Sequence, residues 1–320
     1  MGFDLYAAGT FSKESTQLKR DLGYDQLLSQ YNERKACIEW VEYKRAHPEC
    51  KSKLFIDSGA FTAHTKGVEI DVDEYIEFMN SIDDQVYVFA QVDKIPGVRG
   101  LPKTPQQLAE APILSWENYN YMVTKVKSPK KLIPIFHQGE DFKYLVQMLN
   151  YVYPDTVMDK SCVGQPIDYI GISCNKELSS SDWVEWFTHV FKIIRDSANP
   201  NVKTHAFGMT SLKILEQFPF TSADSTSWIK SASFGHLIMN YTTVYTSNRN
   251  LNDPEHINNQ SPAVREAVAA ICKKYNFDLD EIINNDKPYP RAMFNLCSLK
   301  EWANNYQYRG TNEFKEDLWT

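Results

Sequence analysis

Apolar residues come in short runs along this chain, and most of the runs are separated by stretches with a helical pattern. The runs cover residues 3–8, 53–57, 86–92, 131–136, 168–172, 203–207, 220–223 and 235–240. They are apolar throughout instead of alternating with polar residues, which is typical of parallel strands buried on both faces. Eight such runs, most of them followed by a helix, predict an α/β protein built as a (β/α)8 TIM-like barrel.

The intervening stretches show the period of amphipathic helices and carry helix start signals. We expect helices at 24–47, 71–81, 104–126, 142–151, 181–197 and 212–217, with Asp71, Thr104 and Ser211 at their starts. The last part of the chain has helical patterns at 262–274, 278–284 and 298–305. The sequence therefore predicts a barrel catalytic domain over residues 1–250 and a helical C-terminal cap over 251–320.

Polar residues and glycine follow the predicted strands at the point where each strand ends. These residues are Asp57, Asp93, Gln138, Ser173, Gly208 and Asp224. In a parallel barrel the carboxyl ends of the strands form the face where active sites are built. Turns favour Asp and Gly for structural reasons alone, so any one of these residues has a purely structural alternative. Six of them at one rim favour a functional pocket lined by carboxylates.

Two of these acids stand out because small hydroxylated residues follow them directly. Asp57 begins Asp-Ser-Gly-Ala-Phe, and Asp224 begins Asp-Ser-Thr-Ser-Trp. One carboxylate acting as nucleophile and another as general acid/base are the minimal equipment for breaking and remaking a glycosidic bond. The pair predicts chemistry at the anomeric carbon of a sugar.

Composition narrows the class of protein. The chain has 320 residues, of which 42% are hydrophobic and 13% aromatic, values typical of a globular fold. No apolar run approaches the roughly 18 residues of a membrane span, and the N-terminus has no leader pattern, so we expect no membrane association and a cytoplasmic protein. The six cysteines are isolated in the sequence, and we expect free thiols and no metal site.

The net charge of −7 argues against a surface that is positive overall, although a local basic face could still bind phosphates. Candidates for such a nucleic-acid-binding face are Lys125, Lys127, Lys130 and Lys131, together with Arg249. An ordinary solvated face is the alternative for these residues.

Several strand-end segments resemble the tRNA-guanine transglycosylase family. Residues 57–61 resemble its Asp-Ser-Gly-Gly-Phe motif, and 137–139, His-Gln-Gly, resemble its Val-Gln-Gly. Residues 170–173 and 205–209 resemble its Gly-Gly-Leu and Leu-Met-Gly-Val-Gly segments, and 223–225 stand where the family has Phe-Asp-Cys. The matches occur in family order over about residues 50 to 230.

The resemblance is closer to the DNA-guanine transglycosylases, the DpdA-type proteins of bacteriophages and bacterial genomic islands. Two runs carry it: Phe-Gly-Met-Thr-Ser-Leu-Lys at 207–213 and Ser-Ala-Asp-Ser-Thr-Ser-Trp at 222–228. The tRNA enzymes also carry a zinc site of Cys-x-Cys-x2-Cys plus a distant His, whereas Cys272 and Cys297 stand alone here. The resemblance thus implies that the substrate polymer is DNA and that the zinc subdomain is absent. If the protein is phage-encoded, it would act in the cytoplasm of the host.

The chemistry implied by the resemblance is base exchange without a cofactor. Asp224 would attack the sugar as nucleophile and form a covalent intermediate while guanine leaves. Asp57 would serve as general acid/base for the departing base and for the arriving 7-deazaguanine of the preQ0 type. A deoxyguanosine in duplex DNA would first have to swing out of the stack.

The remaining rim residues would bind the base. Asp93 is placed to accept from the amino and ring N–H groups of a guanine-like edge. Gln138 and the backbone N–H of Gly171 would serve its carbonyl side, and Phe61 and Met209 would cover its two faces, with plain core packing as the alternative for both. The lining is completed by Ser58, Gly139, Ser173 and Gly208.

Three other functions remain open. A tRNA-guanine transglycosylase would use the same chemistry on another polymer. A non-catalytic barrel that binds nucleic acid would not depend on Asp224. A retaining glycoside hydrolase would use the paired acids but would have no need for the base-edge residues Asp93 and Gln138.

Overall fold

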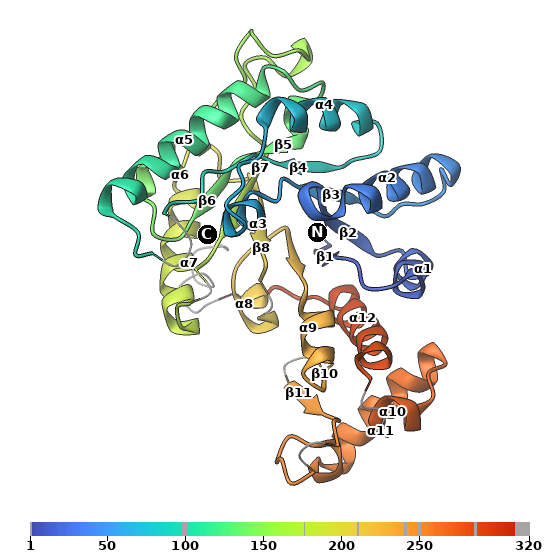
Figure 1. The fold of residues 1–320 in the computed structure, drawn as a ribbon. Coiled ribbons are helices and arrows are strands. Elements are labelled where there is room, and N and C mark those ends of the chain that lie inside the picture. The colour runs from blue at the N-terminus through green and yellow to red at the C-terminus, as the bar shows by residue number, and fades with distance from the viewer. Residues whose placement is uncertain are drawn as a thin grey trace.

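The chain forms a curved, all-parallel sheet of nine strands surrounded by helices, as Figure 1 shows. The computed structural model describes residues 2–97, 101–175, 177–209, 211–239, 242–248, 251–284 and 287–310. The strand order is β5-β4-β3-β2-β1-β9-β8-β7-β6. The strands are β1 (Asp4–Ala8), β2 (Asp25–Ser29), β3 (Leu54–Asp57), β4 (Val88–Ala90), β5 (Leu132–Ile133), β6 (Ile135–His137), β7 (Tyr169–Ser173), β8 (Lys203–Phe207) and β9 (Ser222–Ser225).

The two edges of this sheet meet, which makes it a nearly closed barrel. β5 and β6 lie at opposite ends of the strand order, yet only Pro134 separates them in the sequence. Proline has no N–H to donate to a neighbouring strand, so a single strand is interrupted at this residue. The fold is therefore α/β and TIM-barrel-like, as the eight apolar runs predict.

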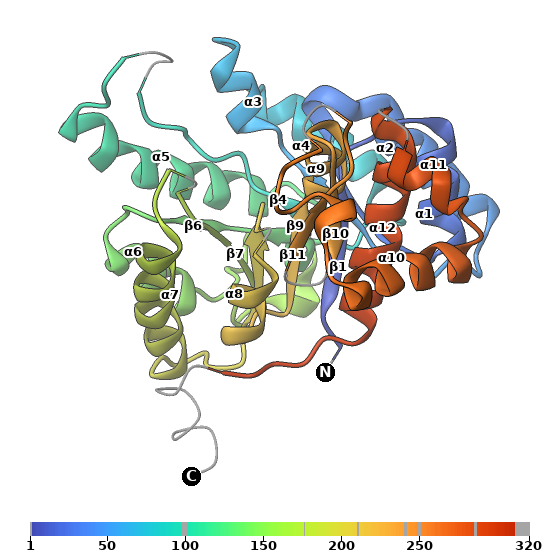
Figure 2. The ribbon, with the colours of Figure 1, turned by 90° about the horizontal axis from the view of Figure 1, so that it is seen from below.

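Helices connect successive strands and cover the outside of the sheet (Figures 1 and 2). They are α1 (Lys13–Asp21), α2 (Gln30–Ala46), α3 (Ala60–Thr65), α4 (Val72–Ile82), α5 (Pro105–Val123), α6 (Phe142–Leu149), α7 (Ser180–Arg195) and α8 (Leu212–Gln217). Two predicted caps form: Asp71 accepts from the Glu74 N–H, and Thr104 exchanges hydrogen bonds with Gln107. Ser211 stands at the start of α8 but makes no capping hydrogen bond.

Two differences from the expectation concern the strands of the barrel. The predicted helix at 24–47 begins with strand β2, and α2 follows without a linker because Ser29 is both the last residue of the strand and the helix N-cap. The run at 235–240 is not a barrel strand: β10 (His236–Met239) pairs antiparallel with β11 (Thr242–Tyr245), and the two form a separate sheet. The eighth strand of the barrel is β2 instead.

The side chains of the strands separate into an interior and an exterior set. Tyr6, Phe55 and Tyr169 belong to the apolar cluster inside the barrel. Their sequence neighbours Leu5, Ile56 and Ile170 belong to the larger cluster under the helices. This alternation fixes which strand-end residues face the mouth of the barrel, because every second side chain lies on the same face.

After β9 the chain leaves the barrel and forms a smaller unit at its side. This unit contains α9 (Ser227–Ser233), the β10–β11 pair, α10 (Pro262–Tyr275), α11 (Leu279–Asn284) and α12 (Pro288–Asn304), and Figure 1 shows the last of these in red. It has its own apolar cluster, centred on Leu237, Val268 and Phe294. Among the described residues, no helix is long and apolar enough to cross a membrane.

Candidate functional site at the carboxyl ends of the strands

The six predicted rim residues lie at the same end of the sheet. Asp57 and Ser173 end β3 and β7, Gln138 and Gly208 directly follow β6 and β8, Asp93 lies three residues after β4, and Asp224 is the next-to-last residue of β9. Because all these strands are parallel, their carboxyl ends form one rim. The structure therefore assembles the set from six different strands.

Asp57 is held in a tight turn that depends on a glycine. Gly59 has a φ of +79°, and a Cβ there would lie 2.5 Å from the Cβ of Tyr31, so no other residue fits. The Gly59 N–H donates to Oδ2 of Asp57 at 3.0 Å. Burial and the nearby negative charges of Asp93 and Asp224 together raise the pKa of Asp57 to about 7, although backbone N–H donors act in the opposite direction. Three carboxylates thus share one site, and Asp57 can carry a proton near neutral pH.

Asp224 has the opposite environment, since donors converge on one of its oxygens. The side chain of this residue is 9% exposed. Its Oδ1 accepts from the Gly208 N–H at 2.6 Å and contacts Nε2 of His205 at 3.3 Å. Hydrogen bonds of this kind stabilise a negative charge on the oxygen and fix its direction. Asp224 is therefore oriented by these hydrogen bonds, beside an acid that can hold a proton.

A chain of buried polar groups supports Asp224 from below. His205 is fully buried, and its Nδ1 lies 2.7 Å from the hydroxyl of Ser222, which in turn contacts the hydroxyl of Tyr169. Ser222 and Asp224 lie two residues apart along β9, so their side chains face the same side of the sheet. The imidazole is thus locked between a hydroxyl inside the barrel and the carboxylate at its mouth.

Asp93 is already paired within the chain. Its Oδ2 lies 2.9 Å from Nε2 of His137, and Nδ1 of the same imidazole lies 3.1 Å from Oε1 of Glu140. Burial disfavours the charged imidazolium, but the hydrogen bonds to Asp93 and Glu140 outweigh it and raise the pKa of His137 to about 10. Asp93 therefore offers a bound base one oxygen, where we expected two.

We predict that this pairing stabilises the fold in a pH-dependent way. The pKa of His137 is raised from its ordinary value of about 6.5 to about 10. The contribution of the pairing to the free energy of unfolding is therefore complete below pH 6.5 and is lost as the pH rises toward 10. His137→Gln should lower the free energy of unfolding by about 3 kcal/mol at pH 6 because it leaves two acids without a cation. Chemical denaturation at pH 6 and pH 9.5 measures this, with the surface variant His189→Gln as control. A loss equal at both pH values would contradict the ion-pair explanation.

Two expected base-binding contacts are occupied by the chain itself, and the side chain of a third residue is partly engaged. The Gly171 N–H donates to the Pro134 carbonyl at 2.8 Å as part of the sheet, so it cannot serve a ligand. Met209 is 2% exposed and belongs to the main apolar core, which favours the packing alternative. Oε1 of Gln138 accepts from the Asn175 N–H at 3.0 Å and so holds the loop after β7, and this bond does not use Nε2, the atom that would donate to a base carbonyl.

The other predicted lining residues surround Asp57 or the turn after β6. Phe61 is 67% exposed on α3, which begins directly after the Asp57 turn, so its ring is available for stacking. Ser58 is buried and its hydroxyl lies 3.4 Å from the Ala60 N–H. Gly139 is exposed in a turn with a φ of +101°. Phe61 is thus an aromatic side chain next to the Asp57 turn that a base could reach.

Two residues at the site, Ser222 and Gln91, escaped the sequence reasoning, whereas His205 was expected near the rim in a hydrogen-bonded role. The role of Ser222 could have been expected from its two-residue spacing from Asp224 along a predicted strand. Gln91 lies inside a run that we took as continuously apolar. It is fully buried two residues before Asp93, and neither atom of its amide has a hydrogen-bond partner among the described residues. A buried amide without partners is costly, which makes Gln91 a candidate for binding a ligand.

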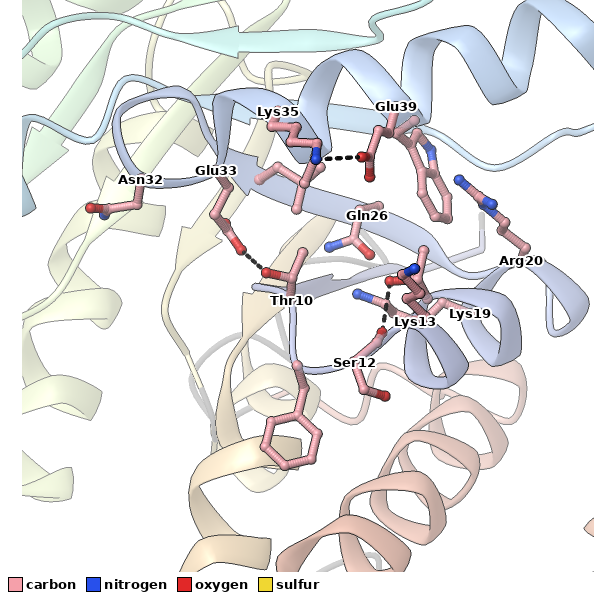
Figure 3. A pocket seen from close by; sticks show the side chains of 15 residues that line it. Thr10, Ser12, Lys13, Lys19, Arg20, Gln26, Asn32, Glu33, Lys35 and Glu39 are labelled. Carbon is pink, nitrogen blue, oxygen red and sulfur yellow. Dashed lines mark hydrogen bonds and ion pairs between the residues drawn. The ribbon is translucent and has the colours of Figure 1, made fainter.

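The structure also contains a cavity away from the mouth of the barrel. This cavity of about 400 Å³ lies on the outer flank, between α1 and α2 (Figure 3). None of the predicted site residues line it.

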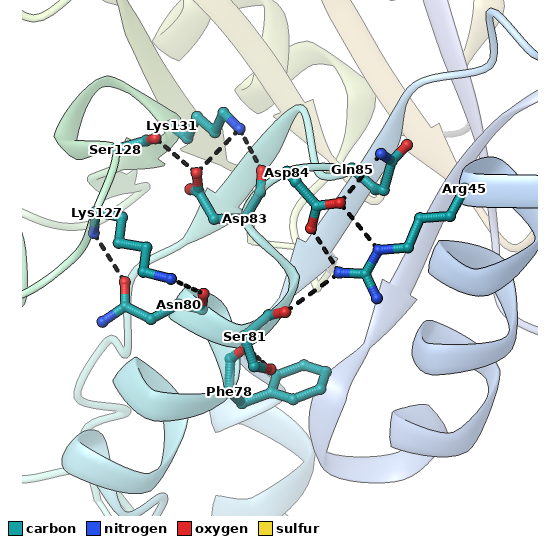
Figure 4. A network of polar contacts seen from close by, with 10 residues as sticks. All are labelled: Arg45, Phe78, Asn80, Ser81, Asp83, Asp84, Gln85, Lys127, Ser128 and Lys131. Atoms are coloured by element: carbon teal, nitrogen blue, oxygen red, sulfur yellow. Dashed lines mark hydrogen bonds and ion pairs between the residues drawn. The ribbon is translucent and has the colours of Figure 1, made fainter. Parts of the chain in front are cut away.

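The predicted phosphate-binding lysines lie at the other end of the barrel. Lys131 directly precedes β5, so this cluster sits at the amino ends of the strands. Figure 4 shows Lys127 bonded to the Asn80 carbonyl and Lys131 paired with Asp83. Lys125 forms an ion pair with Asp73, and Lys130 donates a hydrogen bond to the side chain of Gln165. These lysines hold the loops of that end together, which argues against contact with a nucleic acid bound at the rim. Arg249 lies outside the described residues.

Potential metal ligands do not cluster in the described part of the chain. No group of three His, Cys, Asp or Glu side chains there could hold a metal ion. The six cysteines are free, and all but Cys50 are buried. The thiols therefore belong to the packing of the fold, as their isolated positions predict.

Comparison with known proteins assigns no family to this chain. No protein-family model matches it, and no curated protein matches its sequence. The support for a function at this site therefore comes from the strand-end motifs and from the geometry of the rim.

Proposed function

We propose that this protein is a DNA-guanine transglycosylase, which exchanges guanine in DNA for a 7-deazaguanine base. The observation that supports this most directly is the contrast between two acids at one rim. Asp224 is held by donors that favour negative charge, whereas burial and two neighbouring carboxylates raise the pKa of Asp57 to about 7. A nucleophile beside an acid/base is what displacement at an anomeric carbon requires.

In the first step, an Asp224 oxygen forms a bond to C1′ of the sugar as the bond from C1′ to the base nitrogen breaks. The proton of Asp57 passes to the departing guanine, so the negative charge lost from Asp224 appears on Asp57. In the second step the arriving base gives a proton back to Asp57 and displaces Asp224. Two inversions retain the configuration of the sugar, and neither step needs an oxidant or a nucleotide cofactor.

The base would bind between Asp57 and the residues after β4. The free oxygen of Asp93 can accept from the amino or ring N–H of a guanine edge, and the unpartnered amide of Gln91 can donate to a carbonyl. The exposed ring of Phe61 can stack on the purine. The contact with His137 holds Asp93 in place.

Transfer of a labelled base identifies the polymer. We expect the protein to incorporate a radiolabelled 7-deazaguanine of the preQ0 type into guanine-containing duplex DNA, with release of an equal amount of guanine. The controls are the same duplex with inosine in place of guanine, and unmodified tRNA. Incorporation into tRNA alone would assign the tRNA-directed reaction, and incorporation into neither polymer would contradict base exchange. Release of reducing sugar without incorporation would point to a glycoside hydrolase.

A further inference from the structure

The cavity between α1 and α2 is a second site, separate from the rim. Its floor is the outer face of β2, where Gln26 and Leu28 line it. Leu27, between them, packs inside the barrel together with Phe55. Asp57 lies two residues after Phe55 and so faces the interior, on the other side of the sheet. Figure 3 shows Gln26 in the middle of the cleft, with α2 on one side and α1 on the other.

Buried polar atoms without partners line this cavity. Nε1 of Trp40, Oε1 of Gln26 and Nε of Arg20 have no hydrogen-bond partner among the described residues. Trp40 is 2% exposed and Gln26 is 1% exposed. Nε2 of Gln26 is bonded to the backbone carbonyls of Ala7 and Leu27, which anchors the amide by its nitrogen. Such atoms normally find a partner when buried, so the cavity has two donors and one acceptor to offer.

A buried lysine adds a further donor. Lys19 is 1% exposed, donates to the Gly9 carbonyl at 2.9 Å and lies 5.2 Å from the ring of Trp228. One hydrogen bond to a carbonyl leaves other protons of an ammonium group to be paired. Burial lowers the pKa of Lys19 to about 7, although the charge of Glu33 opposes this. An anion in the cavity would favour the protonated form, so its binding should take up a proton.

The lining as a whole is positively charged. It holds four basic and two acidic residues: Lys13, Lys19, Arg20 and Lys35 against Glu33 and Glu39. Both acids are engaged: Glu33 accepts from the Thr10 hydroxyl and the Ser29 N–H, and Glu39 pairs with Lys35 at 3.8 Å. With Lys19 protonated in the presence of the bound anion, the basic excess of two matches the charge of about −2 on a phosphate monoester better than the single charge of a carboxylate.

We propose that this cleft binds a small organic phosphate, a monoester whose oxygens accept from Trp40, Arg20 and Lys19. The hydroxyl or amino group of its organic part would donate to Oε1 of Gln26. A volume of about 400 Å³ lies in the range of sites for small ligands. The site stands on the outer wall and does not depend on the reaction at the rim.

Isothermal titration of the full chain with a nucleoside 5′-monophosphate and with inorganic phosphate tests this site. We expect one saturable site for the monoester, with proton uptake at pH 8 seen as a dependence of the heat on the buffer. Lys19→Met keeps the volume of the buried side chain, and Trp40→Phe removes only the indole donor and part of the ring. Each should weaken binding about tenfold or more. The exposed-lysine variant Lys51→Met and the rim variant Asp224→Asn should bind like the unaltered protein.

Three results would overturn the proposal. The first is no saturation with the monoester up to about 10 mM. The second is binding that is unchanged in both Lys19→Met and Trp40→Phe when their thermal unfolding shows that they are folded. The third is binding of a short oligonucleotide with a 5′-hydroxyl without binding of the monoester, which would assign the donors to a phosphodiester backbone.

Discussion

Asp224→Asn is expected to abolish the covalent intermediate and to lower the rate of base exchange by about 10⁴-fold. Asparagine has the same shape and can still accept from the Gly208 N–H, but a neutral amide is no nucleophile toward C1′. Intact-mass analysis of the protein mixed with a guanine-containing oligonucleotide and a base analogue measures this directly. The unaltered protein should gain the mass of the oligonucleotide less one base, and the variant should not.

Asp93→Asn is the matched comparison, because it makes the same chemical change at the same rim. Asp93 is proposed to bind the base, so this variant should need more oligonucleotide to saturate but should still form the adduct. A covalent complex that persists in Asp224→Asn and disappears in Asp93→Asn would exchange the roles of the two residues. An exchange rate within tenfold of the unaltered protein in Asp224→Asn would end the transglycosylase proposal and favour a non-catalytic barrel.

Most barrel strands could be predicted because they are short apolar runs bounded by turns. The predicted number of eight is correct only because one strand, β2, was missed and one run, 235–240, was wrongly counted. β2 has only two strongly apolar residues, Leu27 and Leu28, and it passes directly into α2, so its residues fit the helical period of the segment that follows. The run at 235–240 is equally apolar, yet it pairs with β11. Periodicity alone does not say which partner a short apolar run will have.

The site could be predicted where the fold itself determines it. The carboxyl ends of parallel strands must meet, so strand-end residues such as Asp57 and Asp224 were expected at one rim. The pairing of Asp93 with His137 was not, because it joins strands β4 and β6 that are far apart in the sequence. Likewise, the N–H of Gly171 is taken by the neighbouring strand, a constraint that appears only once the register of β6 and β7 is known.

Asp57→Asn is expected to make the protein more stable at pH 8 while it abolishes exchange. Burial and the charges of Asp93 and Asp224 raise the folded-state pKa of Asp57 to about 7, above the unfolded value of about 3.9. Between these values the folded state binds more protons than the unfolded one, so the contribution of Asp57 to stability falls as the pH rises from about 4 to 7. Asparagine never ionises and avoids this cost, which is about 4 kcal/mol at pH 8 for a shift of about three pKa units.

The same proton links stability to activity. Chemical denaturation should show Asp57→Asn more stable at pH 8 and equal to the unaltered protein at pH 3.5, while the surface variant Asp155→Asn changes neither value. Guanine release by the unaltered protein should slow above about pH 7 as Asp57 loses its proton, since the departing base then has no acid. A variant that is less stable at pH 8, or a release rate that does not change between pH 6 and pH 9, would show that Asp57 does not hold the proton. The repulsion among the three carboxylates would then have to be offset by a positive charge instead of by a proton on Asp57. The imidazolium of His137, which contacts Asp93, is the candidate for that charge.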